Sequence, residues 1–512
     1  MAFDFSIFED ASLEEEFVEW LVDEESVDNH IRFGKLWNYY RNEICEISGF
    51  SNIGNKINES SRSYVQAQEC GLPARITGLI PSFVEGVYGG RSIKDIQRKE
   101  VVIENDIAWR INAMVDFLFG KGVNFTSKAP TAQKRAEIES ILKAVFASNG
   151  ALGFLQDMAV LGSVYGFVDC IVKADDTLTN MGFRTVSSST SKPLPFKQVL
   201  ELSHAICLEL VEAPRALPIL YENDYRRINY YVQSYYQVKN SLGKKRSFLS
   251  RLIGRRTSGS DREITQVTEI LGPQAWQRYE NKELIAEGMN ILGIVPVVHI
   301  QNIAQPYYYE GLSDVEPLIP LQDELNTRLS DRANRITFQS FKMYLAKGVE
   351  GFEERPVSPG RMWYTDNMDA GIEEFGGDVQ TPSEDFHISE IREAFDKASG
   401  VTPVAAGILK NRIGNLTSAV ALRMTLLGML SKTERKRFTY GQGLKEICRM
   451  ILYMLDATGA YRTELVDREL DVLFPSPLPE NMMEKLKEAQ IKRELGISQE
   501  QVLRELGYET TE

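Results

Sequence analysis

Residues 318–341 read LIPLQDELNTRLSDRANRITFQSF. Apolar residues recur in it at three- and four-residue steps, which is the spacing of one face of an α-helix. These residues are Leu318, Leu321, Leu325, Leu329, Ala333 and Ile336. About 24 residues at roughly 1.5 Å each make a rod of about 36 Å, which is long for a globular domain. The sequence therefore predicts one long helix with a narrow apolar stripe.

The opposite face of this helix is wide and polar, and it mixes both signs of charge. It carries Gln322, Asp323, Asn326, Arg328, Ser330, Asp331, Asn334 and Arg335. Solvent is the simplest environment for such a face, and the spacing alone does not say what else could lie against it.

A second helix is predicted after an excursion of about 40 residues, which exceeds the usual loop length in compact domains. The excursion is rich in Gly and Pro and has short strand candidates at 342–345 and 361–364. The returning helix starts at Pro382, which suits a first helical position, and ends at Gly400. Long loops of this kind are usually functional.

Composition limits the class of protein. The chain has 512 residues, a net charge of −14 and ordinary globular proportions of 43% hydrophobic and 25% charged residues. Such a charge repels nucleic acid and anionic membranes, so any contact with DNA must be local. Five cysteines without a CxxC pair, an acidic N-terminus and no apolar run of about 18 residues predict an intracellular chain without a membrane span.

Common enzyme signatures do not occur. The sequence has no GxxxxGK[ST] phosphate loop and no HExxH motif, and its four histidines stand far apart. We therefore expect no cofactor and no metal, and we favour a structural or binding protein over an enzyme.

The part before the long helix mixes helices and strands. Residues 103–119 have helical spacing, and residues 152–172 join a helix to a buried strand across Gly162 and Gly166. Further strand-like segments continue to residue 300, so the predicted fold class is α+β.

A basic stretch, KKRSFLSRLIGRRTSGSDR, interrupts these strands at residues 244–262. Its basic residues are Lys244, Lys245, Arg246, Arg251, Arg255 and Arg256. Either this patch binds phosphate or it is the solvated tip of a hairpin, since one aromatic residue, Phe248, makes no interleaved pattern for base stacking.

After Gly400 the sequence predicts a glycine-containing loop and then a helix from Thr417 to about Leu455, with a possible kink near Gly428 or Gly441. The residues from Tyr461 onward are acidic overall and predict one strand and two short helices.

The order of these elements resembles that of the portal proteins of tailed double-stranded DNA bacteriophages. The resemblance rests on motifs that recur in the right order over most of residues 100–510. They are NDIAWRINAMVDFLFGKGVNF (105–125), LQDMAVLGSVYGFVDCIV (155–172), LGIVPVVHIQN with SDVEPLIPLQDELNTRLSDRAN (292–334), SGVTP with GNLTSAVALRMTLLGM (399–429), and FPSPLPEN with GISQEQVLRELGY (474–508). One departure is Ser418-Ala419, where the family often has Ser-Gly.

The resemblance implies a dodecameric ring around an axial tunnel, with a wing, a long-helix stem, a small β-rich clip and a C-terminal helical crown. The wing would comprise residues 1–312, the stem helix 313–341, the clip 342–384, the returning stem helix 385–400, the tunnel loop 401–418, the long kinked wing helix 419–460 and the crown 461–512.

The resemblance also implies roles for particular residues. The polar face of the stem helix would line the channel through Gln322, Asp323, Asn326, Ser330 and Asn334. The tunnel loop would face DNA through Ile408, Leu409, Lys410, Asn411, Arg412 and Ile413, unless it only links two helices away from the axis.

Expected partners are further copies of the chain, double-stranded DNA without sequence preference, terminase, major capsid and scaffolding proteins, and a head–tail adaptor, with no membrane. The ring would sit at the portal vertex of the virion after assembly in the host cytoplasm, and would serve DNA packaging and ejection. Two other interpretations stay open at this point, a minor head or adaptor protein that conducts no DNA, and a nucleic-acid enzyme without a recognisable motif.

Overall fold

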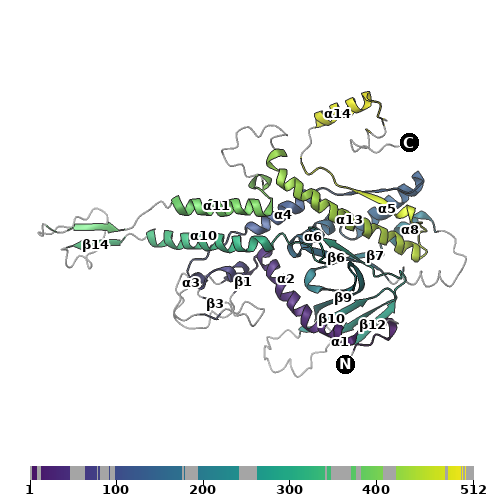
Figure 1. Ribbon diagram of the computed structural model, residues 1–512, viewed down its shortest axis with the longest axis horizontal. Coiled ribbons are helices and arrows are strands. Elements are labelled where there is room, and N and C mark those ends of the chain that lie inside the picture. Colours follow the sequence, from purple (N-terminus) through teal and green to yellow (C-terminus); the bar gives the residue numbers. More distant parts are fainter. Residues whose placement is uncertain are drawn as a thin grey trace, which may run out of the picture.

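The computed structural model describes residues 3–8, 13–46, 64–77, 79–80, 91–92, 99–175, 178, 194–240, 262–340, 343–347, 369, 371–375, 382–406, 423–478, 482–497, 499 and 502. Helices and strands are interspersed along these ranges, so the predicted α+β fold is confirmed. Figure 1 shows a body of helices and sheets with a long two-helix projection on one side.

A three-stranded antiparallel sheet lies at the centre of the body. Its strands follow the order β13 (Val297–Gln301), β6 (Phe167–Ala174), β7 (Ile206–Val211). Two helices, α6 (Leu152–Tyr165) and α13 (Leu427–Ala457), pack against the sheet, and α4 (Asp106–Phe119) packs against both helices. The first six residues of β6 are all buried, which is why this strand reads as a nearly continuous apolar run.

The turn between α6 and β6 requires glycine. Gly166 has a φ angle of +99°, and a Cβ atom there would lie 2.4 Å from the carbonyl oxygen of Gly311. Only glycine adopts this backbone conformation without strain and also permits such a close approach.

A second, five-stranded antiparallel sheet has its own apolar core. Its order is β12 (Glu283–Met289), β11 (Ala275–Glu280), β10 (Arg262–Leu271), β9 (Asp224–Asn240), β8 (Ala216–Tyr221). The N-terminal residues cover one face of this sheet through η1 (Ser6–Phe8), α1 (Glu15–Trp20) and η2 (Leu21–Glu25). The buried residues that meet there include Phe3, Phe8, Val18, Val22, Tyr230, Val232, Ile270 and Tyr279.

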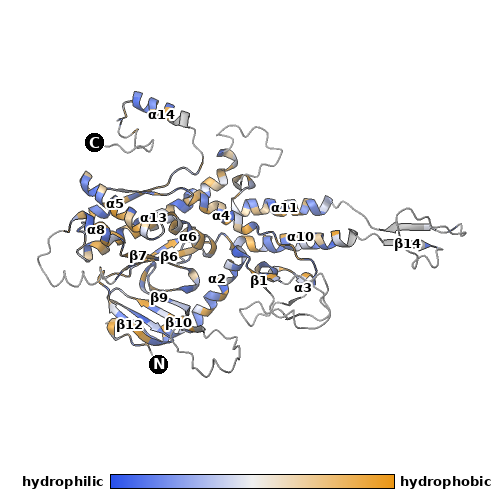
Figure 2. Ribbon diagram, turned by 180° about the vertical axis from the view of Figure 1, so that it is seen from behind, coloured by the Kyte–Doolittle hydropathy of each residue, from blue (hydrophilic) through white to orange (hydrophobic). Residues whose placement is uncertain are grey.

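The projection is the predicted helical hairpin. Helix α10 (Ile319–Ser340) follows η5 (Glu316–Leu318), and α11 (Pro382–Ser399) returns beside it and ends at Gly400, whose φ is +70°. Both predicted helices are therefore confirmed. Figure 2 shows hydrophilic residues along most of the two helices, whereas hydrophobic residues gather around α6 and β6.

Two strands lie between α10 and α11 in the order of the chain. Strand β14 (Met343–Lys347) pairs antiparallel with β15 (Gly371–Phe375), with Met343 opposite Phe375. The first strand lies close to its predicted position. The predicted second strand at 361–364 falls outside the described residues, and the described partner of β14 begins ten residues later than the start of that prediction.

The long helix α13 runs without interruption through Gly428 and Gly441. The chain turns at Leu426 (φ −95°, ψ 9°), two residues before Gly428, between the helical residues 423–425 and α13. Beyond α13, strand β16 (Leu470–Leu473) pairs with β5 (Asn124–Ser127), and α14 (Met482–Glu494) follows.

The remaining elements surround this frame. They are α2 (Ser26–Arg41), β1 (Ile44–Glu46), β2 (Tyr64–Gln66), η3 (Ala67–Gly71), α3 (Ala74–Thr77), β3 (Leu79–Ile80), β4 (Arg91–Ser92), α5 (Ala132–Ser148), α8 (Phe196–Ser203), η4 (Ala213–Arg215), η6 (Pro403–Ala406) and η7 (Val466–Arg468). Among the described residues no single helix is long and apolar enough to span a membrane, and the one pair that would qualify together, α5 and α6, is bent by 69°.

Candidate functional site

The polar face of α10 binds an extended segment of the same chain. This segment, residues 100–106, is called the strap here, and it ends at the first residue of α4. Four backbone N–H groups of the strap donate to four side chains of α10. The pairs are Glu100 to Asn334 Oδ1 (3.0 Å), Val102 to Ser330 Oγ (3.0 Å), Glu104 to Asn326 Oδ1 (3.1 Å) and Asp106 to Gln322 Oε1 (3.1 Å).

The spacing of the two partners explains this ladder of hydrogen bonds. Four helical residues advance about 6 Å along the axis, and two extended residues advance about 6.6 Å. Side chains at every fourth position of the helix therefore meet every second residue of the strap. Several side chains also donate back to strap carbonyls, as Gln322 does to Glu104 (2.5 Å) and Asn334 to Glu100 (3.0 Å).

Asp323 contacts a different part of the body. It accepts a hydrogen bond from the hydroxyl of Tyr39 at 2.6 Å, and a Cβ atom at Gly71 would lie 1.9 Å from its Oδ1. Burial raises the pKa of Asp323 above its usual range, although the Tyr39 hydroxyl opposes this change. Burial likewise raises the pKa of Tyr39.

These contacts correct the channel-lining prediction for three of its five residues. Gln322, Asn326 and Ser330 are 0% exposed because the strap covers them, so they line no channel. The sequence pattern was misleading because a main-chain segment satisfies the same amide and hydroxyl groups that water would satisfy. Asp323 and Asn334 are partly exposed, and their role in a channel stays a prediction.

Among the described residues, two ion pairs join the helices in the outer half of the hairpin. Arg332 lies 2.8 Å from Asp385, and Arg335 pairs with Glu384. Toward the body, α11 buries Ile388, Ile391 and Phe395. Farther out, the apolar side chains of Ile336 and Phe386 are 53% and 66% exposed.

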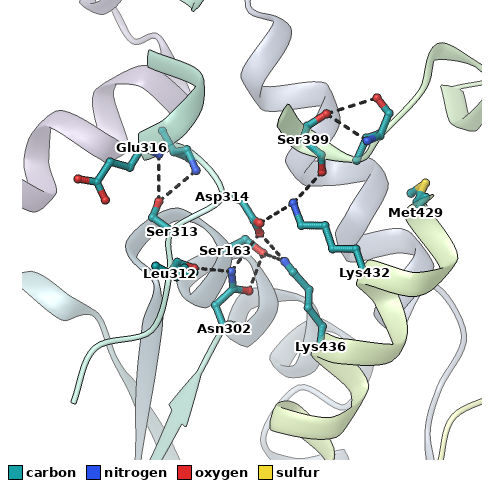
Figure 3. A network of polar contacts seen from close by, with 12 residues as sticks. Ser163, Asn302, Leu312, Ser313, Asp314, Glu316, Ser399, Met429, Lys432 and Lys436 are labelled. Atoms are coloured by element: carbon teal, nitrogen blue, oxygen red, sulfur yellow. Dashed lines mark hydrogen bonds and ion pairs between the residues drawn. The ribbon is translucent and has the colours of Figure 1, made fainter. Parts of the chain in front are cut away.

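One buried carboxylate joins the hairpin to the body. Asp314, just before η5, lies 2.7 Å from the ammonium of Lys432 and also pairs with Lys436, one helical turn further along α13 (Figure 3). Lys436 donates to the Ser163 hydroxyl of α6 at 2.7 Å, and the Asn302 amide donates to Asp314 at 3.1 Å. Residues from four separate segments therefore meet around Asp314.

Lys432 extends this network to the returning helix. Its ammonium donates to the backbone oxygen of Ser399, at the last residue of α11, over 2.7 Å. The network thus holds together Ser399 and Lys432, which lie on the two sides of the connection between α11 and α13.

The charges in the network depend on one another. Burial alone would raise the pKa of Asp314, but Lys436 and Lys432 together hold it well below its usual range. Burial lowers the pKa of Lys436, and Asp314 opposes that change. A charge this deeply buried persists only when it is paired and hydrogen-bonded.

Sequence comparison decides the family. The model of the family described as "Phage portal protein, SPP1 Gp6-like" matches residues 107–511, which is well over half of the chain. The chain belongs to this portal protein family. The resemblance inferred from the sequence is therefore confirmed, and the family is a structural one.

Other comparisons add little to the portal family match. A search of curated proteins returns no significant match. Among solved structures, a chain from the neck of an empty GTA particle, computed with C6 symmetry, is 12% identical. The similarity covers 79% of the present chain and 90% of the other one, with a TM-score of 0.42.

Two predicted sites of the portal chain fall outside the described residues. The tunnel-loop residues 408–413 lie between η6 and the residues that precede α13, and the basic residues between 244 and 256 lie between β9 and β10. Their roles stay predictions. Among the described residues no group of three or more His, Cys, Asp or Glu side chains is placed to hold a metal ion.

Sequence reasoning missed the network around Asp314, although α13 carries a signal for it. Met429, Thr433, Lys436 and Tyr440 are all buried and follow helical spacing, so a lysine stands on the core face of the helix. A lysine in such a position requires a buried acceptor, and Asp314 lies in the quoted motif SDVEP.

Proposed function

We propose that the chain is the subunit of a dodecameric ring at the unique vertex of a phage capsid, through which DNA enters during packaging and leaves during ejection. The portal family match over residues 107–511 carries this proposal. The long α10–α11 hairpin, anchored at its base by buried ion pairs, supports it as the stem of such a subunit.

The regions of the subunit follow the order of the elements. Residues 1–312 form the wing, α10 and α11 the stem, residues 342–384 the clip, residues 419–460 the long wing helix, and residues 461–512 the crown. The clip docks the terminase motor during packaging and the head–tail adaptor afterwards. Its paired strands β14 and β15 fit this role, because a small sheet at a hairpin tip offers edges to neighbouring chains.

The outer stem is the part that most needs a neighbour. Two helices held there by partly exposed ion pairs gain little stability from them, since surface pairs contribute about 0–1 kcal/mol each. Ile336 and Phe386 remain more than half exposed in the single chain. Adjacent stems in a ring would cover these side chains, as subunit interfaces bury apolar residues at their core.

The channel must let DNA slide. A chain with a net charge of −14 makes few lasting phosphate contacts, which suits a conduit better than a tight DNA-binding protein. The loop at 401–418 is the candidate for the narrowest part of the channel, with Lys410 and Arg412 as brief phosphate contacts. The protein acts without catalysis of its own.

Native mass spectrometry of the purified full-length chain tests the proposal. We expect a species of dodecameric mass besides any free 58.0 kDa subunit. A chain that remains monomeric at all concentrations and in the presence of scaffolding protein would instead support an adaptor role.

A further inference from the structure

A cavity of about 540 Å³ lies where the stem joins the body. Its walls come from the last turn of α11, the segment before α10 and the first turns of α13. Figure 3 shows part of this wall, with Lys432, Ser399 and Asp314 close together and Glu316 nearby. The volume falls within the range of ligand sites, which is about 300–1,000 Å³.

Three cations and two carboxylates line this cavity. Lys397, Lys432 and Arg435 face two carboxylates, Asp314 and Glu316. The charge of Asp314 is already balanced, because this carboxylate pairs with Lys432 and with the buried Lys436, which does not line the cavity. The cavity therefore keeps a positive charge that its own carboxylates do not neutralise, in a chain that is strongly acidic overall.

Two of these cations are available to a ligand. Lys397 and Arg435 are exposed, and neither makes a hydrogen bond or an ion pair with the described residues. Lys397 stands in the last turn of α11, where a cation also favours the helix dipole, so its position has a structural reason. The helix dipole gives no such explanation for the position of Arg435, which lies in the first third of α13.

The uncharged part of the lining also suits an anion. Gly428, in the first turn of the 31-residue helix α13, and the hydroxyl-bearing Ser431 face the cavity. The helix contributes a partial positive charge at this end. The carboxyl end of α11 also borders the cavity, but its negative partial charge is reduced because the backbone oxygen of Ser399 accepts a hydrogen bond from Lys432.

We propose that this cavity is a phosphate-binding site that contacts the backbone of double-stranded DNA without reading its sequence. Arg435 and Lys397 supply the mobile charges, and Lys432 supplies a fixed one. The proposal rests on the proposed function, since DNA in the channel is the source of the phosphate. Gly400 and Gly428, which line the cavity, stand on either side of the candidate tunnel loop in the sequence. The site therefore lies where the chain enters and leaves that connection.

A salt titration of DNA binding tests the site. A fluorescent 20-base-pair duplex is added to the full-length chain, and its anisotropy is followed from low to moderate KCl. The variant Lys397→Gln/Arg435→Gln is compared with Lys143→Gln/Lys197→Gln, which removes the same charge from exposed positions on α5 and α8. Thermal unfolding confirms that both variants fold.

We expect the cavity variant to bind the duplex about tenfold more weakly at low salt, and the slope of log K against log salt to fall by about 1–2, one unit per lost phosphate contact. The control should keep the slope of the unaltered chain. Equal slopes in the two variants, or no measurable binding by the unaltered chain, would overturn the proposal.

Competition identifies the source of the phosphate. Inorganic phosphate that displaces the duplex from the unaltered chain, but not from the cavity variant, supports a site for single phosphate groups. Binding of the duplex alone, still lost in the cavity variant, supports a site for the DNA backbone. Binding without a dodecamer in native mass spectrometry would refute the proposed ring and leave the phosphate site standing.

Discussion

The ammonium of Lys432 lies 2.7 Å from a carboxylate oxygen of Asp314 and 2.7 Å from the backbone oxygen of Ser399. One side chain of α13 therefore links the segment before α10 to the end of α11. Movement of the stem relative to the body would break these bonds, so we expect the stem and the body to move together.

Replacing Asp314 by Asn should destabilise the chain strongly. The substitution leaves Lys436 charged and buried without its partner, and breaking a buried ion pair costs about 3–5 kcal/mol. Urea unfolding measures the change. The control is Asp471→Asn, because Asp471 makes two ion pairs but its side chain is 41% exposed. The control should lose at most about 1 kcal/mol, and equal losses in the two variants would contradict the role of Asp314.

The contribution of Asp314 should persist down to acidic pH. Its folded-state pKa is lowered, so its stabilising effect is fully present above the unfolded pKa of about 3.9 and is lost only as the pH falls through the lower folded value. The difference in unfolding free energy between the unaltered chain and Asp314→Asn should stay constant from about pH 7 to 5. A difference that already shrinks in that window would show that another group is responsible.

Asn326→Ala should release the strap. Asn326 accepts a hydrogen bond from the Glu104 amide at 3.1 Å and donates one to the buried Gln68 at 3.0 Å, and its loss removes both bonds. We expect a loss of about 2–4 kcal/mol and faster hydrogen exchange at residues 100–106. Asn334→Ala, at the less buried end of the ladder, should cost less. Unchanged exchange at Glu104 would contradict the assigned contact.

Charged residues on the outer stem should block assembly without unfolding the subunit. Ile336→Asp/Phe386→Asp places carboxylates where the proposed ring buries two apolar side chains. Because both positions are more than half exposed in the single chain, its unfolding free energy should change by about 0.5 kcal/mol or less per site. Native mass spectrometry should then show subunits in place of rings. Normal rings from this variant would exclude these residues from the interface.

The sequence was a good guide to the elements of this fold and a poor one to their surroundings. The α10–α11 hairpin was predictable because helical periodicity is a local property. The apolar spacing from Leu318 to Ile336 indicated the first helix, and Pro382 and Gly400 marked the start and the end of the second. The environment of Gln322, Asn326 and Ser330 was predicted wrongly for a different reason. Glu104 and Asn326 are 222 residues apart, and the strap binds through its main chain, which leaves no pattern of residue types.

The same reasoning applies to the base of the stem. A lysine at position 436 on an apolar helical face indicates a buried partner, but only the folded chain shows that Asp314 is that partner. The family was recognisable because it depends on the order of several weak motifs, which a sequence displays directly.

Cryo-electron microscopy of the purified full-length chain tests whether the subunits form a ring around a channel. We expect closed rings in which the α10–α11 hairpins surround a hole wide enough for duplex DNA, with Ile336 and Phe386 buried between neighbours. Particles without a central hole, or rings whose stems point away from the axis, would contradict it.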